Sequence, residues 1–241
     1  MNKYKINTEK IIDNIFIISS VLIIILLIIY SIKSDNFNIN NVNINNNDFL
    51  TNDEIEGILN IELENKNIFN INISELKKSI NKHNYIRSSK IYTTYPNNIF
   101  IHINEIIPIV LFEENSQYFL IDHRTNKIKA DIKALNYYSV PIISINEFNS
   151  TDIYKIVNTL KYITVANNKL YNSIDEIIIE KEFSYIIVNN TKIKLNKNNI
   201  ENDIFKFVQF INDTQDSKDI NRYKYVNVTV PNQIIVKERK M

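Results

Sequence analysis

The sequence predicts an α+β protein with an N-terminal transmembrane helix, a small β-α-α-β-β domain, and a mixed, mainly antiparallel β domain with flanking helices. Three observations lead to this fold class. An uncharged apolar run near the N-terminus is long enough to cross a bilayer. Capping patterns before helically spaced apolar residues predict helices, whereas alternating polar and apolar residues predict strands. These strands and helices occur in groups and do not alternate strictly, which is typical of α+β proteins.

Residues 14–33 are predicted to form the transmembrane helix. The run from 15 to 32 is apolar except for three serines, and it spans about 28 Å, close to the ~30 Å hydrocarbon core of a bilayer. A cleaved secretory signal is the alternative, but no small-residue cleavage site follows the run. Three lysines precede it: Lys3, Lys5 and Lys10. After Lys33 the next basic residue is Lys66, so the positive-inside rule predicts that residues 1–13 form a cytoplasmic tail.

Residues 35–105 are predicted to form the small domain, in the order strand, helix, helix, strand, strand. Alternating apolar residues predict the first strand over 35–47. Two capping boxes predict the helix starts: Thr51 with Glu54, and Asn72 with Glu75. The last two strands are expected at 88–93 and 99–103, with a turn at 95–98. Gly57 falls in the first helix, where glycine is expected to cost about 1 kcal/mol relative to alanine.

Residues 106–238 are predicted to form the second domain, which is rich in strands. Strands are expected at 110–113, 118–122, 127–130, 174–180, 183–188, 191–195, 223–230 and 233–237. Apolar residues recurring every three or four positions predict helices at 151–165 and near 200–211.

The composition excludes several classes of enzyme. The 241 residues include one glycine and no cysteine, whereas an average chain of this length has about seventeen glycines. Phosphate-binding P-loops, dinucleotide-binding turns and nucleophile elbows all require glycine. The lack of cysteine excludes a thiol nucleophile, a cysteine-ligated zinc site and a disulfide. Because glycine is so scarce, we expect asparagine, which tolerates left-handed backbone, to form the hairpin turns.

The sequence contains no recognisable catalytic or metal-binding constellation. The histidines, at 83, 102 and 123, are not separated by a metal-ligand interval, and His102 is expected on a strand surface. Asp122 and His123 point to opposite faces of a strand and so do not form a catalytic pair; we expect a hairpin there with Asn126 in the bend. The carboxylate pairs at 113–114 and at 201 and 203 are expected in solvated segments. No catalytic residue, cofactor, metal or small-molecule substrate is therefore expected.

The net charge of +1 comes without a block of basic residues. Nucleic-acid binding depends on a basic patch that neutralises phosphates. We therefore expect no nucleic-acid partner.

Several motifs, in order along the chain, resemble the bacterial cell-division proteins FtsQ and DivIB. The POTRA stretch of that family reads roughly W-V-x-x-A-x-V-x-R-x-x-P-x-x-L-x-I-x-V-x-E-R-x-P. Here the matching positions are Tyr85, Ile86, Ser89, Ile91, Pro96, Ile99, Ile101, Ile103, Glu105 and Pro108. Further segments similar to family motifs are 67–71, 119–122, 141–143 and 225–237. Four positions lack the charges of the family pattern, so ion pairs made through them are not carried over: Thr93, Ile106, Asn227 and Thr229.

The resemblance implies a single-pass type II protein of the cytoplasmic (inner) membrane, located at the division septum. Residues 35–105 would be the POTRA domain and 106–238 the FtsQ-type β domain. It implies a non-catalytic divisome scaffold that binds FtsB/FtsL-like coiled-coil proteins and links early and late septum-assembly proteins. Two alternatives remain: a POTRA-containing envelope assembly or transport protein, and a membrane-anchored envelope enzyme.

In this family the partner adds a strand to the last strand of the β domain. Strand addition requires an exposed sheet edge with available N–H and C=O groups. Pro231 lacks an N–H and would mark where pairing begins. We therefore expect partner binding by Tyr225, Asn232, Gln233, Ile234, Ile235, Val236 and Lys237. The alternative is that Ile235 and its neighbours only fill the core of the β domain.

Overall fold

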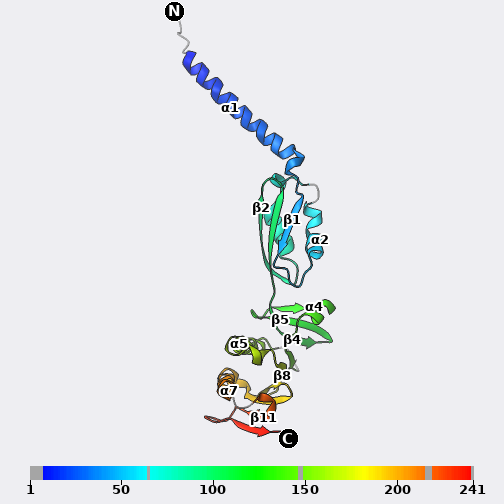
Figure 1. Cartoon of the computed structure of the whole chain (residues 1–241), viewed down its shortest axis with the longest axis vertical. Helices are drawn as coiled ribbons and strands as arrows, with labels where there is room; N and C mark the ends of the chain where they lie inside the picture. The colour runs from blue at the N-terminus through cyan, green and yellow to red at the C-terminus, as the bar shows by residue number, and fades with distance from the viewer. Residues whose placement is uncertain (1–7, 64–65, 146–148, 215–218, 240–241) are drawn as a thin grey trace, which may run out of the picture. The chain divides into compact units, whose positions relative to one another are not determined.

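The structure is a computed structural model that describes residues 8–63, 66–145, 149–214 and 219–239. The chain divides into two compact units, Met1–Glu105 and Ile106–Met241. Each unit has its own sheet, with three strands in the first and nine in the second (Figure 1). The α+β class predicted from the sequence is confirmed.

The first unit begins with the long helix α1 (Thr8–Lys33). Its segment Ile12–Lys33 is long and apolar enough to cross a membrane. Three serine hydroxyls in this segment donate to backbone carbonyls three or four residues earlier, so these polar groups are compatible with a lipid environment. Lys3 and Lys5, on which the predicted orientation depends, lie outside the described residues.

The sheet of the first unit has the order β1-β3-β2. Its strands are β1 (Asn41–Asn45), β2 (Ile86–Thr94) and β3 (Asn98–Glu105). β1 runs parallel to β3, and β2 runs antiparallel to it. The helices α2 (Asn52–Leu63) and α3 (Ile73–Ile80) contribute buried apolar residues to the same core. That core includes Ile55, Leu59, Leu76, Ile80, Ile99, Ile101 and Ile103.

The helix starts of this unit follow the predicted capping patterns. Thr51 and Glu54 form a reciprocal capping box: the Thr51 Oγ1 accepts from the Glu54 N–H at 3.2 Å, and the Glu54 carboxylate accepts from the Thr51 N–H at 2.7 Å. Asn72 Oδ1 accepts from the N–H groups of Ser74 and Glu75. Local side chains therefore satisfy the donors that each helix start exposes.

The predicted strand over 35–47 is wrong in its first part. Residues Asp35–Phe37 form the 3₁₀ helix η1, and β1 begins only at Asn41. Ser34 caps η1 by accepting from the Asn36 N–H. A capping residue therefore prevails over the alternating pattern, because it offers the backbone a local hydrogen-bond partner.

Gly57 lies in the interior of α2, and a Cβ atom added there would meet no heavy atom within 4 Å. Gly57→Ala is therefore expected to stabilise the first unit by about 1 kcal/mol, because alanine loses less backbone entropy in a helix. Urea unfolding followed by far-UV circular dichroism measures this change. An unchanged or lowered midpoint for the first unit would contradict the prediction.

The sheet of the second unit has the order β12-β11-β10-β9-β8-β7-β4-β5-β6. The strands are β4 (Pro108–Glu114), β5 (Gln117–Asp122), β6 (Lys127–Lys129), β7 (Ile142–Ile145), β8 (Ile174–Ile179), β9 (Phe183–Val188), β10 (Thr191–Asn196), β11 (Tyr223–Asn227) and β12 (Ile235–Glu238). Five of the eight pairings are antiparallel and three are parallel, so the sheet is mixed and mainly antiparallel, as predicted.

Two helices of the second unit, α5 (Ser150–Ala166) and α7 (Ile200–Thr214), pack on each other and on the sheet. Their apolar residues join alternate residues of the strands in one large core. Three short elements are absent from the sequence prediction: α4 (Ile132–Tyr137), α6 (Asn168–Tyr171) and β7. Each has six residues or fewer, and hydrophobic periodicity is a weak signal over so few residues.

Asparagine occupies most of the left-handed backbone positions, as expected. The two-residue turns of the hairpins β4–β5 and β9–β10 are Asn115–Ser116 and Asn189–Asn190, all four with positive φ, as type I′ hairpin turns require. In the turn after β5, however, Thr125 and not Asn126 has positive φ. The buried carboxylate of Asp122 imposes this geometry, since it accepts from the N–H groups of residues 124 and 126.

Candidate functional site

The strand β12 lies at one edge of the sheet of the second unit. It pairs antiparallel with β11, and it is the terminal strand in the order of the sheet. Among the described residues no strand pairs with its other side. All four of its residues are exposed, including Ile235 at 48% and Val236 at 37%. This edge therefore combines available backbone with exposed β-branched side chains.

The direction of each backbone group in β12 follows from one hydrogen bond. The Arg239 N–H donates to the Arg222 carbonyl at 2.8 Å, so it points toward β11. The register irregularity of this pair lies in β11, between Tyr223 and Tyr225, so N–H direction still alternates along β12. The N–H of Val236 therefore points away from β11. Val236 thus offers a main-chain donor to a strand added at this edge.

The register of the strands sorts the side chains at this edge between the two faces of the sheet. Ile235 pairs with Asn227, Lys237 pairs with Tyr225, and Tyr225 pairs with Lys192 of β10. These side chains lie on the face opposite the α5–α7 core. Val236 instead pairs with the fully buried Val226, so it lies on the core side. A strand added to β12 would have Ile235 and Lys237 as neighbours on the open face.

The open face near this edge carries aromatic rings beneath lysines. The Lys192 Nζ lies 3.8 Å from the ring centroid of Tyr185, and the Lys194 Nζ lies 3.5 Å from that of Phe183. Burial, and next the neighbouring Tyr185, raise the pKa of Tyr225 above its usual value. These lysines and rings come from β9 and β10, and sequence reasoning missed them because only the register places them beside β11.

The remaining residues predicted to bind a partner precede β12. Asn232 takes left-handed backbone with φ 60°, and Asn232 and Gln233 are exposed. Ile234 is partly buried and packs against the core. The alternative in which these residues only fill the core of the β domain therefore applies to Ile234. It does not apply to Ile235, which is exposed.

The opposite edge of the sheet differs in character. The strand β6 has three residues, and its exposed positions are lysines. Lys127 forms an ion pair with Glu114 and lies 4.2 Å from the ring centroid of Phe119. Short edges with lysines resist pairing with other strands. β12 is only one residue longer and ends in Lys237 and Glu238, but its first two residues are exposed and apolar, which favours it as the docking edge.

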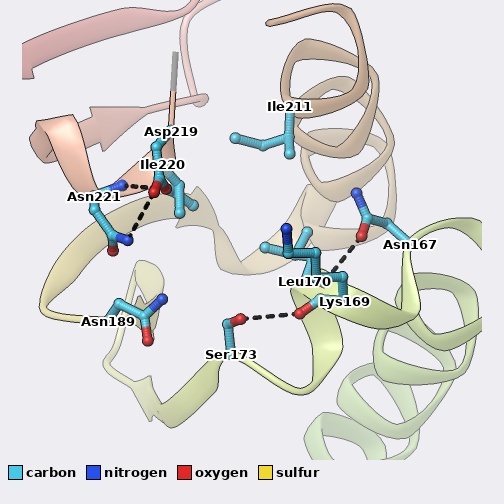
Figure 2. Close-up of a pocket in the computed structure, with 9 residues that line it drawn as sticks. All are labelled: Asn167, Lys169, Leu170, Ser173, Asn189, Ile211, Asp219, Ile220 and Asn221. Carbon is cyan, nitrogen blue, oxygen red and sulfur yellow. Dashed lines mark hydrogen bonds between the residues drawn. The ribbon is translucent and has the colours of Figure 1, made fainter. Parts of the chain in front are cut away.

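A pocket of about 260 Å³ lies between α6, α7, the 3₁₀ helix η4 (Ile220–Arg222) and the β9–β10 turn (Figure 2). Its polar groups already serve the local structure. Asn167 Oδ1 accepts from the Leu170 N–H. The carboxylate of Asp219 accepts from the backbone N–H and from the side-chain Nδ2 of Asn221. The side chains that line it include no nucleophile paired with a base.

The ionisable groups considered in the sequence do not gather into a reactive site. Within the described part of the chain, no three His, Asp or Glu side chains are close enough to share a metal ion. His102 lies beside Tyr92, with 3.3 Å between the His102 Nε2 and the tyrosine hydroxyl. Asp203, expected in a solvated segment, is instead buried. Its carboxylate accepts from the Asn196 N–H at 2.8 Å and joins the start of α7 to the end of β10.

Comparison with known proteins identifies relatives of the chain. Residues 37–105 match the model of the FtsQ-type POTRA domain. The cell division protein DivIB of Clostridium tetani is 27% identical over 132 residues, which cover 54% of this chain and 49% of that protein. The cell division protein FtsQ of Rickettsia prowazekii is 30% identical over 70 residues, which cover 29% of this chain and 26% of that protein. Over these residues the chain is similar to FtsQ and DivIB. The matches span about half, or less, of the length of these curated relatives.

Among solved structures, the extracytoplasmic domain of DivIB from Geobacillus stearothermophilus matches with a TM-score of 0.35 and 8% identity. The match covers 48% of this chain and 99% of that one. At that TM-score the likeness adds nothing to the relationship that the sequences establish.

Glu105, the acidic residue of the FtsQ-like pattern, has a structural role in the first unit. Its carboxylate accepts from three consecutive backbone N–H groups in the segment between β1 and α2, at distances of 2.8–3.2 Å. Those donors belong to Asp48, Phe49 and Leu50, and the last two residues are buried. Glu105 therefore connects the end of β3 to the loop before α2.

The chain also departs from the family pattern near the edge strand. The terminal Asp-x-Arg of FtsQ-like sequences is replaced by Asn227 and Thr229. The Thr229 hydroxyl donates to Asn227 Oδ1 at 2.8 Å, and the Thr229 N–H donates to the same oxygen at 3.0 Å. A neutral hydrogen-bonded pair thus occupies the end of β11 in this chain.

Proposed function

We propose that this chain is a membrane-anchored, non-catalytic scaffold of bacterial cell division. It binds FtsB/FtsL-like coiled-coil proteins by strand addition at β12 and links early and late septum-assembly proteins. Residues 14–33 anchor it in the cytoplasmic membrane as a type II protein, with residues 1–13 in the cytoplasm. Residues 35–105 act as the POTRA domain and 106–238 as the β domain, and both work on the extracytoplasmic side at the septum.

The observation that carries this proposal is the open edge of β12 in a relative of cell division proteins. Exposed edges are usually blocked by lysines, bulges or covering segments, because they invite pairing with other chains. Here Ile235 and Val236 leave the first half of the edge apolar and accessible, while Lys237 and Glu238 make its second half charged. Main-chain pairing would supply affinity, and the contacts of Ile235, Lys237 and Tyr225 on the open face would supply specificity.

A fluorescent fusion of the full chain tests the cellular role. We expect its signal to concentrate at the division septum, and we expect FtsB/FtsL-like proteins to co-purify with it from detergent-solubilised membranes. A diffuse envelope signal together with co-purification of only non-division proteins would overturn the proposal.

Val236→Pro tests strand addition. The substitution removes an N–H that points away from β11, so the pairing of β11 with β12 loses no hydrogen bond. We expect partner binding to weaken at least tenfold, equivalent to about 1.4 kcal/mol, because the added strand loses a donor and meets the proline ring. Co-purification yield and the dissociation constant of the detergent-solubilised proteins measure the effect.

Val236→Ala is the matched control, since it shortens the same side chain but keeps the N–H. Circular dichroism should show that both variants are folded. Binding by a folded Val236→Pro variant that equals the binding of Val236→Ala would rule out strand addition at this edge.

A further inference from the structure

Three aromatic side chains form a cluster at the end of the first unit where α1 joins it. The Phe37 and Phe69 ring centroids lie 5.2 Å apart, and those of Phe69 and Tyr95 lie 5.3 Å apart in a stacked arrangement. Phe69 is 44% exposed and Tyr95 is 62% exposed. We refer to Phe37, Phe69 and Tyr95 as the aromatic cluster. Its partial exposure is unusual for a stacked group of large rings, which more often lies in a core.

The side chain of Asn67 fixes this cluster against the last turn of α1. Its Nδ2 donates to the carbonyls of Ser31 and Ser34 at 2.9 and 3.2 Å, and its Oδ1 accepts from the Phe69 N–H. Asn67 is buried and is the N-cap of the 3₁₀ helix η2 (Ile68–Asn70), which carries Phe69. The position of Phe69 is therefore tied directly to the end of α1.

Tyr95 reaches the same end of the unit from the β2–β3 turn. The Asn40 N–H donates to the Asn97 carbonyl at 3.2 Å, and Asn41 Nδ2 donates to Asn98 Oδ1 at 3.0 Å. These bonds hold the turn beside the start of β1. Segments far apart in sequence thus converge on one aromatic surface next to α1.

The depth of this surface follows from the length of the apolar helix. The segment that can cross a membrane ends at Lys33, and Asn67 bonds to carbonyls on either side of that residue. The headgroup layer beyond the hydrocarbon core is about 5–7 Å thick on each side. Asn67 therefore holds the Phe69 ring close to the end of α1, within or next to that layer.

The chemistry of the cluster suits this layer. Aromatic rings, above all those with a polar tip such as tyrosine, concentrate at membrane–water interfaces. Three charged residues within four positions of Phe37 or Phe69 are exposed: Lys33, Asp35 and Lys66. The carboxylate of Asp35 accepts from Asn38 Nδ2, whereas both lysines are able to interact with lipid phosphates.

We propose that the aromatic cluster inserts into the headgroup layer of the same bilayer that α1 crosses. It is a second membrane contact, and it holds the POTRA domain against the membrane surface at a defined orientation. This inference rests on the membrane anchoring in the proposed function, but not on partner binding at β12. The occupant of the surface is lipid, because the cluster is continuous with the end of an apolar helix.

The absence of tryptophan from the chain allows a direct test with single tryptophan variants. Phe69→Trp places the probe in the cluster, and Leu22→Trp places one in the middle of α1. Ile107→Trp is the matched control, since Ile107 is 61% exposed and follows β3, whose eight residues carry the chain about 26 Å from the β2–β3 turn. The full chain is reconstituted in nanodiscs of phosphatidylcholine and phosphatidylglycerol, with and without lipids that carry bromine at the upper or at the lower end of the acyl chain.

We expect the brominated lipids to quench Phe69→Trp and Leu22→Trp strongly and to leave Ile107→Trp unquenched. The emission maximum of Phe69→Trp in nanodiscs should also lie at a shorter wavelength than that of a tryptophan-containing peptide in water. Quenching of Leu22→Trp without quenching of Phe69→Trp would overturn this inference and leave the anchor intact, as expected if a protein partner covers the cluster instead. If Leu22→Trp were also unquenched, both the anchor and the inference would be wrong.

Discussion

Phe207→Ala is expected to destabilise the second unit by about 3–5 kcal/mol, because it opens a large cavity in the main core. Phe207 lies on α7, is 1% exposed, and is among the largest fully buried side chains of the described chain. Its ring joins α7 to the strands of the nine-stranded sheet through the shared core. Urea unfolding of the full chain in detergent, followed by far-UV circular dichroism, measures the loss as a lower midpoint.

Phe205→Ala is the matched control for this prediction. Phe205 lies two residues earlier on the same helix, but its ring is exposed. Its replacement is expected to change stability by no more than about 0.5 kcal/mol, as is usual for surface positions. Equal losses for the two variants would show that α7 does not bury the face that contains Phe207.

Glu105→Ala is expected to destabilise the first unit by about 3 kcal/mol. The substitution leaves three backbone N–H groups without their carboxylate acceptor, and hydrogen bonds to charged groups contribute about 1.5–3 kcal/mol each without being additive. Phe49 and Leu50 are buried, so water replaces the lost acceptor only in part. Urea unfolding measures the shift in the transition of the first unit.

Two further variants separate the role of this carboxylate from a general effect of lost charge. Glu105→Gln retains one acceptor oxygen and is expected to cost less than Glu105→Ala. Glu56→Gln removes a carboxylate from an exposed position on α2 and is expected to be nearly neutral. A loss for Glu105→Ala no larger than for Glu56→Gln would contradict the role assigned to Glu105.

The helices and long strands were predictable because their signals are local. A capping box such as Thr51 with Glu54 satisfies backbone donors within four residues, and the apolar face that follows needs only to meet some core. Asparagine turns were predictable for the same reason, since positive φ is a property of one residue. Where two local signals competed, as at residues 35–37, the capping bond of Ser34 prevailed over alternation.

The buried carboxylates were not predictable from local sequence. Asp203 and Asp122 are polar residues in polar stretches, a pattern typical of solvated segments. Their burial depends on backbone N–H groups that they accept from, at Asn196 for Asp203 and at Asn126 for Asp122. A buried carboxylate is tolerated only when such partners are in place.

At the candidate site, the sequence by itself determined the run of β-branched residues after Pro231 and, through the family resemblance, its assignment as a last strand. Only the tertiary structure decided which residues face solvent. The register of β11 with β12 places Ile235 and Lys237 on the open face and Val236 on the other, while Ile234 joins the core. The physical reason is that a strand alternates its side chains with a period of two, so its composition is the same in either register, and only pairing with a neighbour decides which face is buried.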